Sequence, residues 1–264
     1  MKYLRILVAF LPQRIRIKLL KTSWPYFLWS LLSNYIESIK LNYKKGVMQS
    51  YSQNGEDIIC ARYLPEENGS YIDVGCGQPV HDSNTFFLYK RGWSGIVIDP
   101  ILNNYKLYRL LRRKDNFRKI LIGCPTEEKG VDFYEFIPYL YSTTSPSVAQ
   151  TSITNGRILK SVTSLQVASL STFTPRIDPL SASLLSIDIE GLEMECLRTI
   201  NFDTYMPRVI CVEEWDETIT SSQSEVREFL SAVNYSFVAR TRLSSIFVHN
   251  EYLALHGELR SQIL

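Results

Sequence analysis

A glycine turn between two short apolar runs is the feature that most constrains how this chain can fold. The first run, Tyr71-Ile-Asp-Val74, leads into Gly75-Cys76-Gly77, and a second run at 95–98 ends at Asp99. Glycine lets the backbone turn sharply and approach a ligand closely. An acid after the second strand of such a unit can bind ribose hydroxyls. The stretch therefore predicts half of a nucleotide-binding α/β unit.

The glycine spacing also separates classes of cofactor. The third glycine of a dinucleotide fingerprint would fall at Val80. Because the glycines of that fingerprint serve a pyrophosphate, its absence argues against NAD and FAD. A cofactor with a ribose and no phosphate fits better, and we expect S-adenosyl-L-methionine (SAM). A glycine turn between a strand and a helix also occurs in α/β proteins that bind no nucleoside, so the turn alone is weak evidence.

Apolar runs continue to alternate with helical patterns beyond this unit. They predict strands at 119–123, 131–136, 184–189 and 207–212, and a closing antiparallel hairpin at 235–239 and 245–249. Helices are predicted at 82–90 and 101–113, and the bases Arg112, Arg113 and Lys114 at the end of the second suit its dipole without any ligand. Such alternation implies a mostly parallel sheet covered by helices on both faces.

Charge divides the chain into a basic front and a mildly acidic body. Residues 1–50 contain nine Lys or Arg and one acid, Glu37, whereas the remainder contains 20 bases and 26 acids. We therefore predict an amphipathic extension at 1–49 and a catalytic domain at 50–264, with a Ser/Thr-rich insertion at about 141–183. The basic segment 1–45 can lie on an anionic membrane face, or pack on the body or on a second subunit. The overall charge of +2 predicts no nucleic-acid partner.

Cysteine usage and hydropathy bear on the compartment. The five cysteines form no Cys-x-x-Cys pair, and the three histidines do not cluster beside them, so we expect reduced thiols and no zinc site. No apolar run has the length needed to span a bilayer. We expect a cytoplasmic protein, with peripheral contact at the inner membrane face if segment 1–45 binds lipid.

Acidic residues follow the predicted strands, where ligands of open α/β sheets bind. Asp73 and Asp99 end the first two strands, and the later strand ends carry Asp188, Glu190, Glu213, Glu214 and Asp216. Such acids can hold Mg²⁺, deprotonate a substrate hydroxyl, or bind substrate hydroxyls without chemistry. Asp188 is the strongest single candidate because the apolar run before it fixes its position. Glu190 and Asp216 can also be helix caps. Glu56, in a polar loop at 52–57, can cap a helix or lie over the cofactor.

The chain resembles the FkbM family of SAM-dependent methyltransferases in segments spread over about residues 50 to 250. The matching segments are Ser52-Gln-Asn-Gly-Glu-Asp57, Tyr71-Ile-Asp-Val-Gly75, Ser83-Asn-Thr85, Gly92-Trp-Ser-Gly95, Ile98-Asp-Pro100, Ser186-Ile-Asp-Ile-Glu-Gly191 and Val212-Glu213. The resemblance implies a class I methyltransferase (Rossmann-like) fold with a seven-stranded sheet. It also implies methyl transfer to oxygen, with a sugar, glycan or natural-product hydroxyl as acceptor. Cys76-Gly-Gln-Pro79 departs from the Ala-Asn or Ala-Phe of many relatives.

The resemblance also suggests roles for individual residues. It places Asp73 and Gly75 at the methionine end of SAM and Asp99 on its ribose, and it places Asp188 and Glu213 near the reacting hydroxyl. The full set of predicted cofactor contacts is Glu56, Asp73, Gly75, Gly77, Asn84, Asp99 and Pro100. Glu190 is a third catalytic candidate, and Asp188, Glu213 and Glu214 are the candidate ligands of a cation such as Mg²⁺. A nucleotide-sugar-dependent glycosyltransferase-like enzyme and a non-catalytic SAM-binding protein are the alternatives.

Overall fold

The computed structural model describes Leu32 and residues 49–124, 130–214 and 224–256. The predicted amphipathic extension thus lies outside the described residues, apart from Leu32 and residue 49, and so does Asp216. The chain divides into two compact units, and Val131–Leu165 belongs to the smaller one. Within the described ranges, every helix is too short or too polar to cross a lipid bilayer.

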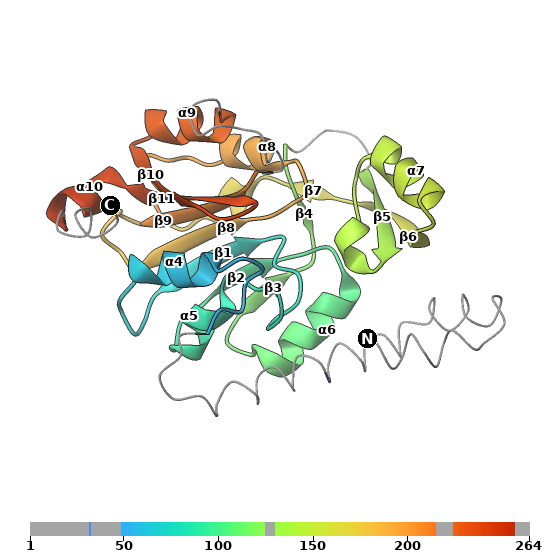
Figure 1. The fold of residues 1–264 in the computed structure, drawn as a ribbon, viewed down its shortest axis with the longest axis horizontal. Helices are drawn as coiled ribbons and strands as arrows, with labels where there is room; N and C mark the ends of the chain where they lie inside the picture. The colour runs from blue at the N-terminus through green and yellow to red at the C-terminus, as the bar shows by residue number, and fades with distance from the viewer. Residues whose placement is uncertain (1–31, 33–48, 125–129, 215–223, 257–264) are drawn as a thin grey trace. The chain divides into compact units, whose positions relative to one another are not determined.

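A seven-stranded sheet forms the centre of the larger unit, in the order β10-β11-β9-β8-β1-β2-β3 (Figure 1). Its strands are β1 Ser70–Val74, β2 Ser94–Ile98, β3 Asn116–Arg118, β8 Ser183–Ile187, β9 Val209–Glu213, β10 Tyr235–Arg240 and β11 Ser244–His249. The first five run parallel to one another, whereas β11 is antiparallel to both β9 and β10. This arrangement confirms the predicted α/β fold with a closing hairpin.

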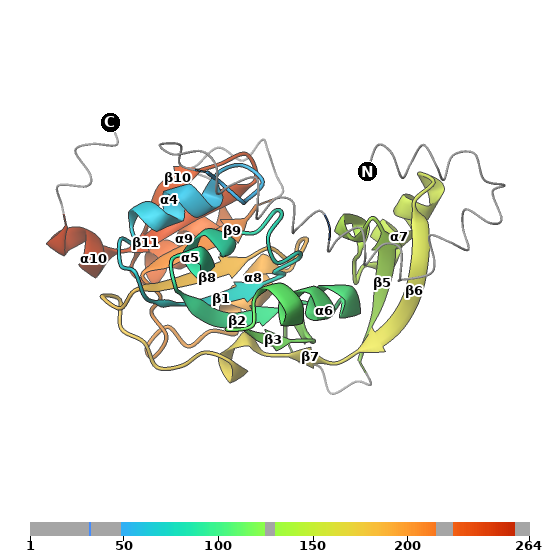
Figure 2. The ribbon, with the colours of Figure 1, turned by 90° about the horizontal axis from the view of Figure 1, so that it is seen from below.

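Helices cover both faces of this sheet because successive side chains of each strand point to opposite faces. Tyr71 packs in one buried cluster with residues of α4, α5 and α6, and Ile72 packs in another with residues of α8 and α9. Figures 1 and 2 show these two helical layers. The helices are α4 Glu56–Arg62, α5 Phe86–Lys90, α6 Leu102–Leu111, α8 Glu193–Arg198, α9 Glu225–Ala232 and α10 Asn250–Leu255.

The third strand lies earlier in the sequence than predicted. The sheet uses Asn116–Arg118, whereas the more apolar Leu121–Ile122 (β4) pairs with β7, Val167–Ala168, outside it. The reason is Asp115, whose carboxylate accepts hydrogen bonds from the Gly95 N–H at 3.1 Å and the Tyr71 hydroxyl at 2.6 Å. These bonds fix the chain beside β2 just before Asn116.

The smaller unit is built on an antiparallel hairpin of β5, Val131–Ile137, and β6, Ile158–Leu165. Between the two strands lie a 3₁₀ turn, Tyr139–Tyr141, and helix α7, Pro146–Thr154, with Ser145 as its cap. The insertion predicted at 141–183 therefore contributes residues to both units. Its first part belongs to this hairpin, and its last part returns to the larger unit through β7 and a 3₁₀ turn, Leu170–Thr172.

Candidate active site

Three of the predicted acids meet at the carboxyl edge of the sheet. Asp188 directly follows β8, Glu213 is the last residue of the adjacent β9, and Glu190 lies two residues beyond Asp188. One carboxylate oxygen from each of the three lies within 4.8 Å of the others. Glu213 is buried, Asp188 is half-buried and Glu190 is exposed, so the cluster runs from the interior to the surface.

Burial and mutual repulsion raise the pKa values of all three carboxyl groups. Burial is the main cause for Asp188 and Glu213, and the charges of neighbouring acids add to it for both. A proton on Glu213 relieves the repulsion between its charge and that of Asp188, so the pKa of Glu213 rises further than that of Asp188. Glu190 is the most exposed of the three, and partial desolvation beside the cluster, followed by the charges of Asp188 and Glu193, raises its pKa. When neighbouring carboxyl groups have different pKa values, the group with the lower pKa can act as the base and the group with the higher pKa as the acid.

The backbone that carries Asp188 lies directly against the glycine turn. The Asp188 N–H donates to the Val74 carbonyl at 2.9 Å, which extends the β1–β8 pairing beyond Ile187. Gly75 has φ +77°, and a Cβ on it would lie 1.6 Å from the Asp188 carbonyl oxygen. Only glycine permits this contact, so Gly75 positions the catalytic candidate as well as the predicted cofactor turn.

The predicted cofactor residues Asp99 and Gly77 lie together after β2 and β1. The Asp99 carboxylate accepts hydrogen bonds from the Gly77 N–H at 3.2 Å, the Ile101 N–H at 2.7 Å and the Asn104 side chain at 3.1 Å. It therefore holds the glycine turn and the start of α6, which the sequence did not indicate. Pro100 follows it and is half-buried. Contact of Asp99 with a ribose stays a prediction.

Asp73 and Asn84 attach the segment between β1 and α5 to the sheet. Asp73 is 3% exposed and accepts a hydrogen bond from the Thr85 hydroxyl at 2.6 Å. Burial raises its pKa, and the bonds from Thr85 and Ser186 oppose that rise. The Asn84 amide donates to the Ser186 hydroxyl at 3.1 Å. The structure therefore gives Asp73 an interior anchoring role, whatever it contributes to cofactor binding.

Glu56 lies in the same region, as the first residue of helix α4. Its carboxylate accepts hydrogen bonds from the Asn54 N–H at 2.8 Å and from the Thr241 hydroxyl at 2.7 Å. Burial would raise the pKa of Glu56, but these bonds outweigh it and lower that pKa. Glu56 thus remains charged and ties the 52–57 loop to the turn between β10 and β11.

A small polar pocket of about 10 Å³ joins these loops to the carboxylate cluster. Its lining residues are Gln53, Asn54, Glu56, Asp82, Asn84, Asp188, Glu213, Leu243 and Ser244. Asp82, Leu243 and Ser244 were not predicted, because nothing local in the sequence shows that the 241–244 turn folds back over the strand ends. Amide, hydroxyl and carboxylate groups dominate the lining, and such groups bind hydroxyls by hydrogen bonds.

Glu214 and Glu213 diverge although they are adjacent in sequence. Glu214 accepts hydrogen bonds from the Ser224 hydroxyl and from Arg240 at 3.3 Å, the latter as an ion pair. The structure therefore does not bring Glu214 into the carboxylate cluster. Glu213 has a buried oxygen, Oε2, for which the described residues provide no hydrogen-bond partner.

The donor set at this edge fits the chemistry of SAM. The buried carboxylate of Asp99, next to the glycine turn, is a suitable acceptor for ribose hydroxyls. Asp188 and Glu213 contribute carboxyl groups near a polar pocket, and negative charge there would favour a sulfonium cation. Cofactor and reaction centre would then share one edge of the sheet.

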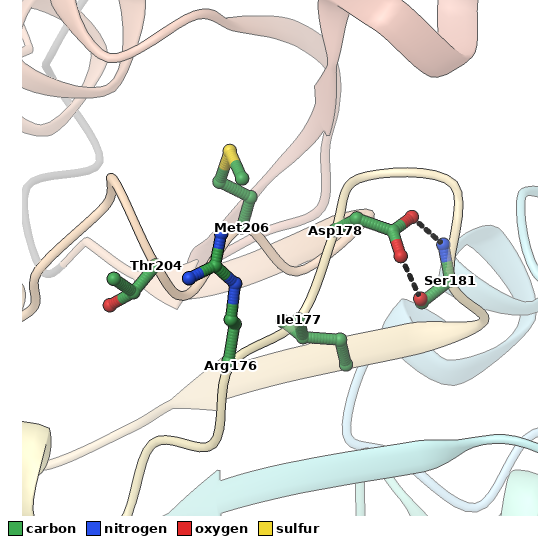
Figure 3. A pocket seen from close by; sticks show the side chains of 6 residues that line it. All are labelled: Arg176, Ile177, Asp178, Ser181, Thr204 and Met206. Carbon is green, nitrogen blue, oxygen red and sulfur yellow. Dashed lines mark hydrogen bonds between the residues drawn. The ribbon is translucent and has the colours of Figure 1, made fainter.

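A separate hollow of about 360 Å³ is formed by segments that lead into β8 and β9 (Figure 3). Its residues are Arg176, Ile177, Asp178, Ser181, Thr204 and Met206. Asp178 is engaged with Ser181, and the strands enter the sheet here. Asp188 and Glu213, by contrast, lie where β8 and β9 end. The hollow therefore belongs to the opposite edge from the carboxylates.

The sequence matches the Methyltransferase FkbM domain over residues 73–237. The matched stretch starts within β1 and ends within β10, so it includes the glycine turn, Asp99 and the three clustered acids. No curated protein matches the chain.

Proposed function

The chain belongs to the FkbM methyltransferase family, and from that premise we propose that it transfers a methyl group from SAM to a hydroxyl oxygen. The observation that carries the proposal is the convergence of Asp188, Glu190 and Glu213 beside a polar pocket at the carboxyl edge of the sheet. The acceptor we propose is a sugar, a glycan or another hydroxylated natural product, because the pocket is lined largely by groups that bind hydroxyls.

The cofactor would lie across the ends of β1 and β2. We assign Asp99 to the ribose hydroxyls and the Gly75–Gly77 turn to the backbone contact with the nucleoside. The methionine end would then lie toward Asn84 and the region above Asp73. This assignment is supported by the short distance between Asp99 and the Gly77 N–H, 3.2 Å.

The chemistry requires alignment and a base. Bound SAM would supply an activated methyl group and a good leaving group, and the acceptor oxygen would attack the methyl carbon in line as the carbon–sulfur bond breaks. Asp188 would take the hydroxyl proton as the new carbon–oxygen bond forms, because its pKa is raised less than that of Glu213, which keeps its own proton. A carboxylate is a stronger base when its pKa is raised toward neutrality, as burial does for Asp188.

A divalent cation held by the same acids is the second candidate for activating the hydroxyl. The observation that favours it is the buried, unpartnered Oε2 of Glu213 among the described residues. With Asp188 and Glu190 it completes a set of oxygen ligands of the kind that Mg²⁺ or Mn²⁺ prefers. The base remains our primary assignment, because burial raises the pKa of the Asp188 carboxyl group toward neutrality, where it can accept a proton from a hydroxyl without a cation.

Calorimetry and a transfer assay test the proposal together. The purified protein should bind SAM and not UDP-sugars, which separates it from a glycosyltransferase-like enzyme. Labelled SAM should methylate members of a panel of free and lipid-linked glycans, and a protein that binds SAM but modifies none would support a non-catalytic role.

The Asp188→Asn variant tests how the hydroxyl is activated. Asp188→Asn should retain SAM binding and lose transfer. Full activity of Asp188→Asn would refute both the base and the cation, whereas wild-type activity that vanishes with a chelator and returns with Mg²⁺ would favour the cation.

A further inference from the structure

We infer that Arg112 is a positioning residue. It would hold the glycine turn and the 79–85 segment that follows it from the interior of the protein, without touching the cofactor. The inference rests on the proposed function, since it assumes that SAM lies on the turn after β1. Arg112 directly follows helix α6 as its C-terminal cap and is 1% exposed, although it starts a basic run. A guanidinium so deeply buried needs a reason, because moving a charge out of water is costly unless it is paired and hydrogen-bonded.

Part of that reason is an ion pair inside the larger unit. The Arg112 Nε donates to Asp115 Oδ2 at 2.7 Å, and both side chains are fully buried. Asp115 also accepts from the Tyr71 hydroxyl, to which Arg112 Nη2 donates at 2.8 Å. These bonds anchor the guanidinium to β1 and to the start of β3.

The rest of the guanidinium reaches the segment between the glycine turn and α5. Nη1 donates to the Pro79 carbonyl at 3.2 Å and to the Ser83 hydroxyl at 3.1 Å. Nη2 donates to the Thr85 hydroxyl at 2.9 Å, which in turn donates to Asp73 at 2.6 Å. One planar group therefore fixes both ends of this segment. Asn84, a predicted cofactor contact that also lines the polar pocket, lies between two of its partners.

An aromatic surround holds the guanidinium in place. Its central carbon lies 4.9 Å from the ring centre of Tyr108 and 5.1 Å from that of Tyr89. The Tyr108 hydroxyl donates to the carbonyl of Cys76, inside the glycine turn, at 3.1 Å. Lysine cannot replace this arrangement, because an ammonium carries three donors at one point and cannot span Pro79, Ser83 and Thr85 together.

The expected consequence is a loss of SAM affinity in a protein that remains folded. Arg112→Lys keeps the charge opposite Asp115 but removes the bridge to the 79–85 segment. We expect the Kd for SAM to rise at least tenfold, while kcat at saturating SAM changes much less, because Asp188 and Glu213 lie on other strands. Ser83→Ala and Thr85→Val, which each remove one hydroxyl partner of Arg112, should raise the Kd severalfold.

Titration calorimetry with SAM tests this, with circular dichroism to verify folding. The matched control is Tyr235→Phe, which removes a buried hydroxyl bonded to the Pro207 carbonyl at 2.8 Å and far along the sheet from the turn. It should lower the melting temperature and leave the Kd unchanged. A folded Arg112→Lys with the wild-type Kd would overturn the inference. If Arg112→Lys does not fold, a wild-type Kd in both Ser83→Ala and Thr85→Val would overturn it. Failure of the wild-type protein to bind SAM would instead refute the proposed function itself.

Discussion

Replacing Gly75 by alanine tests whether the contact between the glycine turn and the end of β8 holds the site together. The φ of Gly75 is +77°, a conformation that costs an alanine about 1–2 kcal/mol. The added Cβ would also lie 1.6 Å from the Asp188 carbonyl oxygen, so one of the two backbones has to move. Overpacking of this kind adds about 1–3 kcal/mol. We therefore expect Gly75→Ala to lower the free energy of unfolding by about 2–5 kcal/mol, a large share of the roughly 5–15 kcal/mol of a typical domain.

Urea unfolding followed by tryptophan fluorescence is the assay, because Trp93 is fully buried in the core of the larger unit. Gly55→Ala is the control for backbone strain alone, since Gly55 has φ +91° and a Cβ added to it would meet no described atom within 4 Å. It should cost only about 1–2 kcal/mol. If the two variants differ by less than about 0.5 kcal/mol, the range within which independent effects usually add, the approach of Gly75 to Asp188 contributes nothing beyond backbone strain. Wild-type methyl transfer by folded Gly75→Ala would likewise refute the link between the turn and Asp188.

Three further perturbations address the acids and the basic front. Because the folded pKa of Glu213 is raised, its stabilising contribution is complete below its unfolded pKa of about 4.5 and is lost as the pH rises through the folded value. Urea unfolding at pH 5 and pH 8 should therefore show that Glu213→Gln loses less unfolding free energy between the two pH values than the wild type does. Equal losses would contradict the raised pKa of Glu213. Asp99→Ala should weaken SAM binding by about 1–3 kcal/mol in calorimetry, and unchanged affinity in the folded variant would remove the ribose assignment. Deleting residues 1–45 should leave SAM binding intact and reduce sedimentation with anionic liposomes at low salt; loss of SAM binding would instead make the segment structural.

The sequence was sufficient for the parts of the fold that depend on local pattern. The strands around the glycine turn and the last hairpin were predicted because their apolar runs are short, continuous and bounded by turns. The third strand was misplaced because its pairing depends on Asp115, which bonds to Gly95 and Tyr71 on other strands. No periodicity in the 119–123 run could show that a carboxylate upstream fixes the register.

The same distinction applies to the site. The approach of Asp188 to Glu213 follows from two adjacent parallel strands that each end in an acid. Arg112 shows what sequence reasoning could not predict. Its position in a basic run at a helix end suggested only a favourable interaction with the helix dipole, not burial. Arg113 and Lys114 are exposed as that interpretation requires. Burial of one base among three is decided by tertiary contacts that no local pattern records.

Because β11 lies between β9 and β10 in the sheet, β9 gains its second neighbour only after β10 and β11 have both been translated. Glu213 ends β9, whose second neighbour, β11, is synthesised about 30 residues later. Until that strand leaves the ribosome, β9 is an open edge able to pair with other chains. Thr241, the partner of Glu56, also arrives only with this last hairpin. A nascent chain that already contains the glycine turn and all three clustered acids therefore still lacks the strand that covers β9, which ties the assembly of the site to the synthesis of the β10–β11 hairpin.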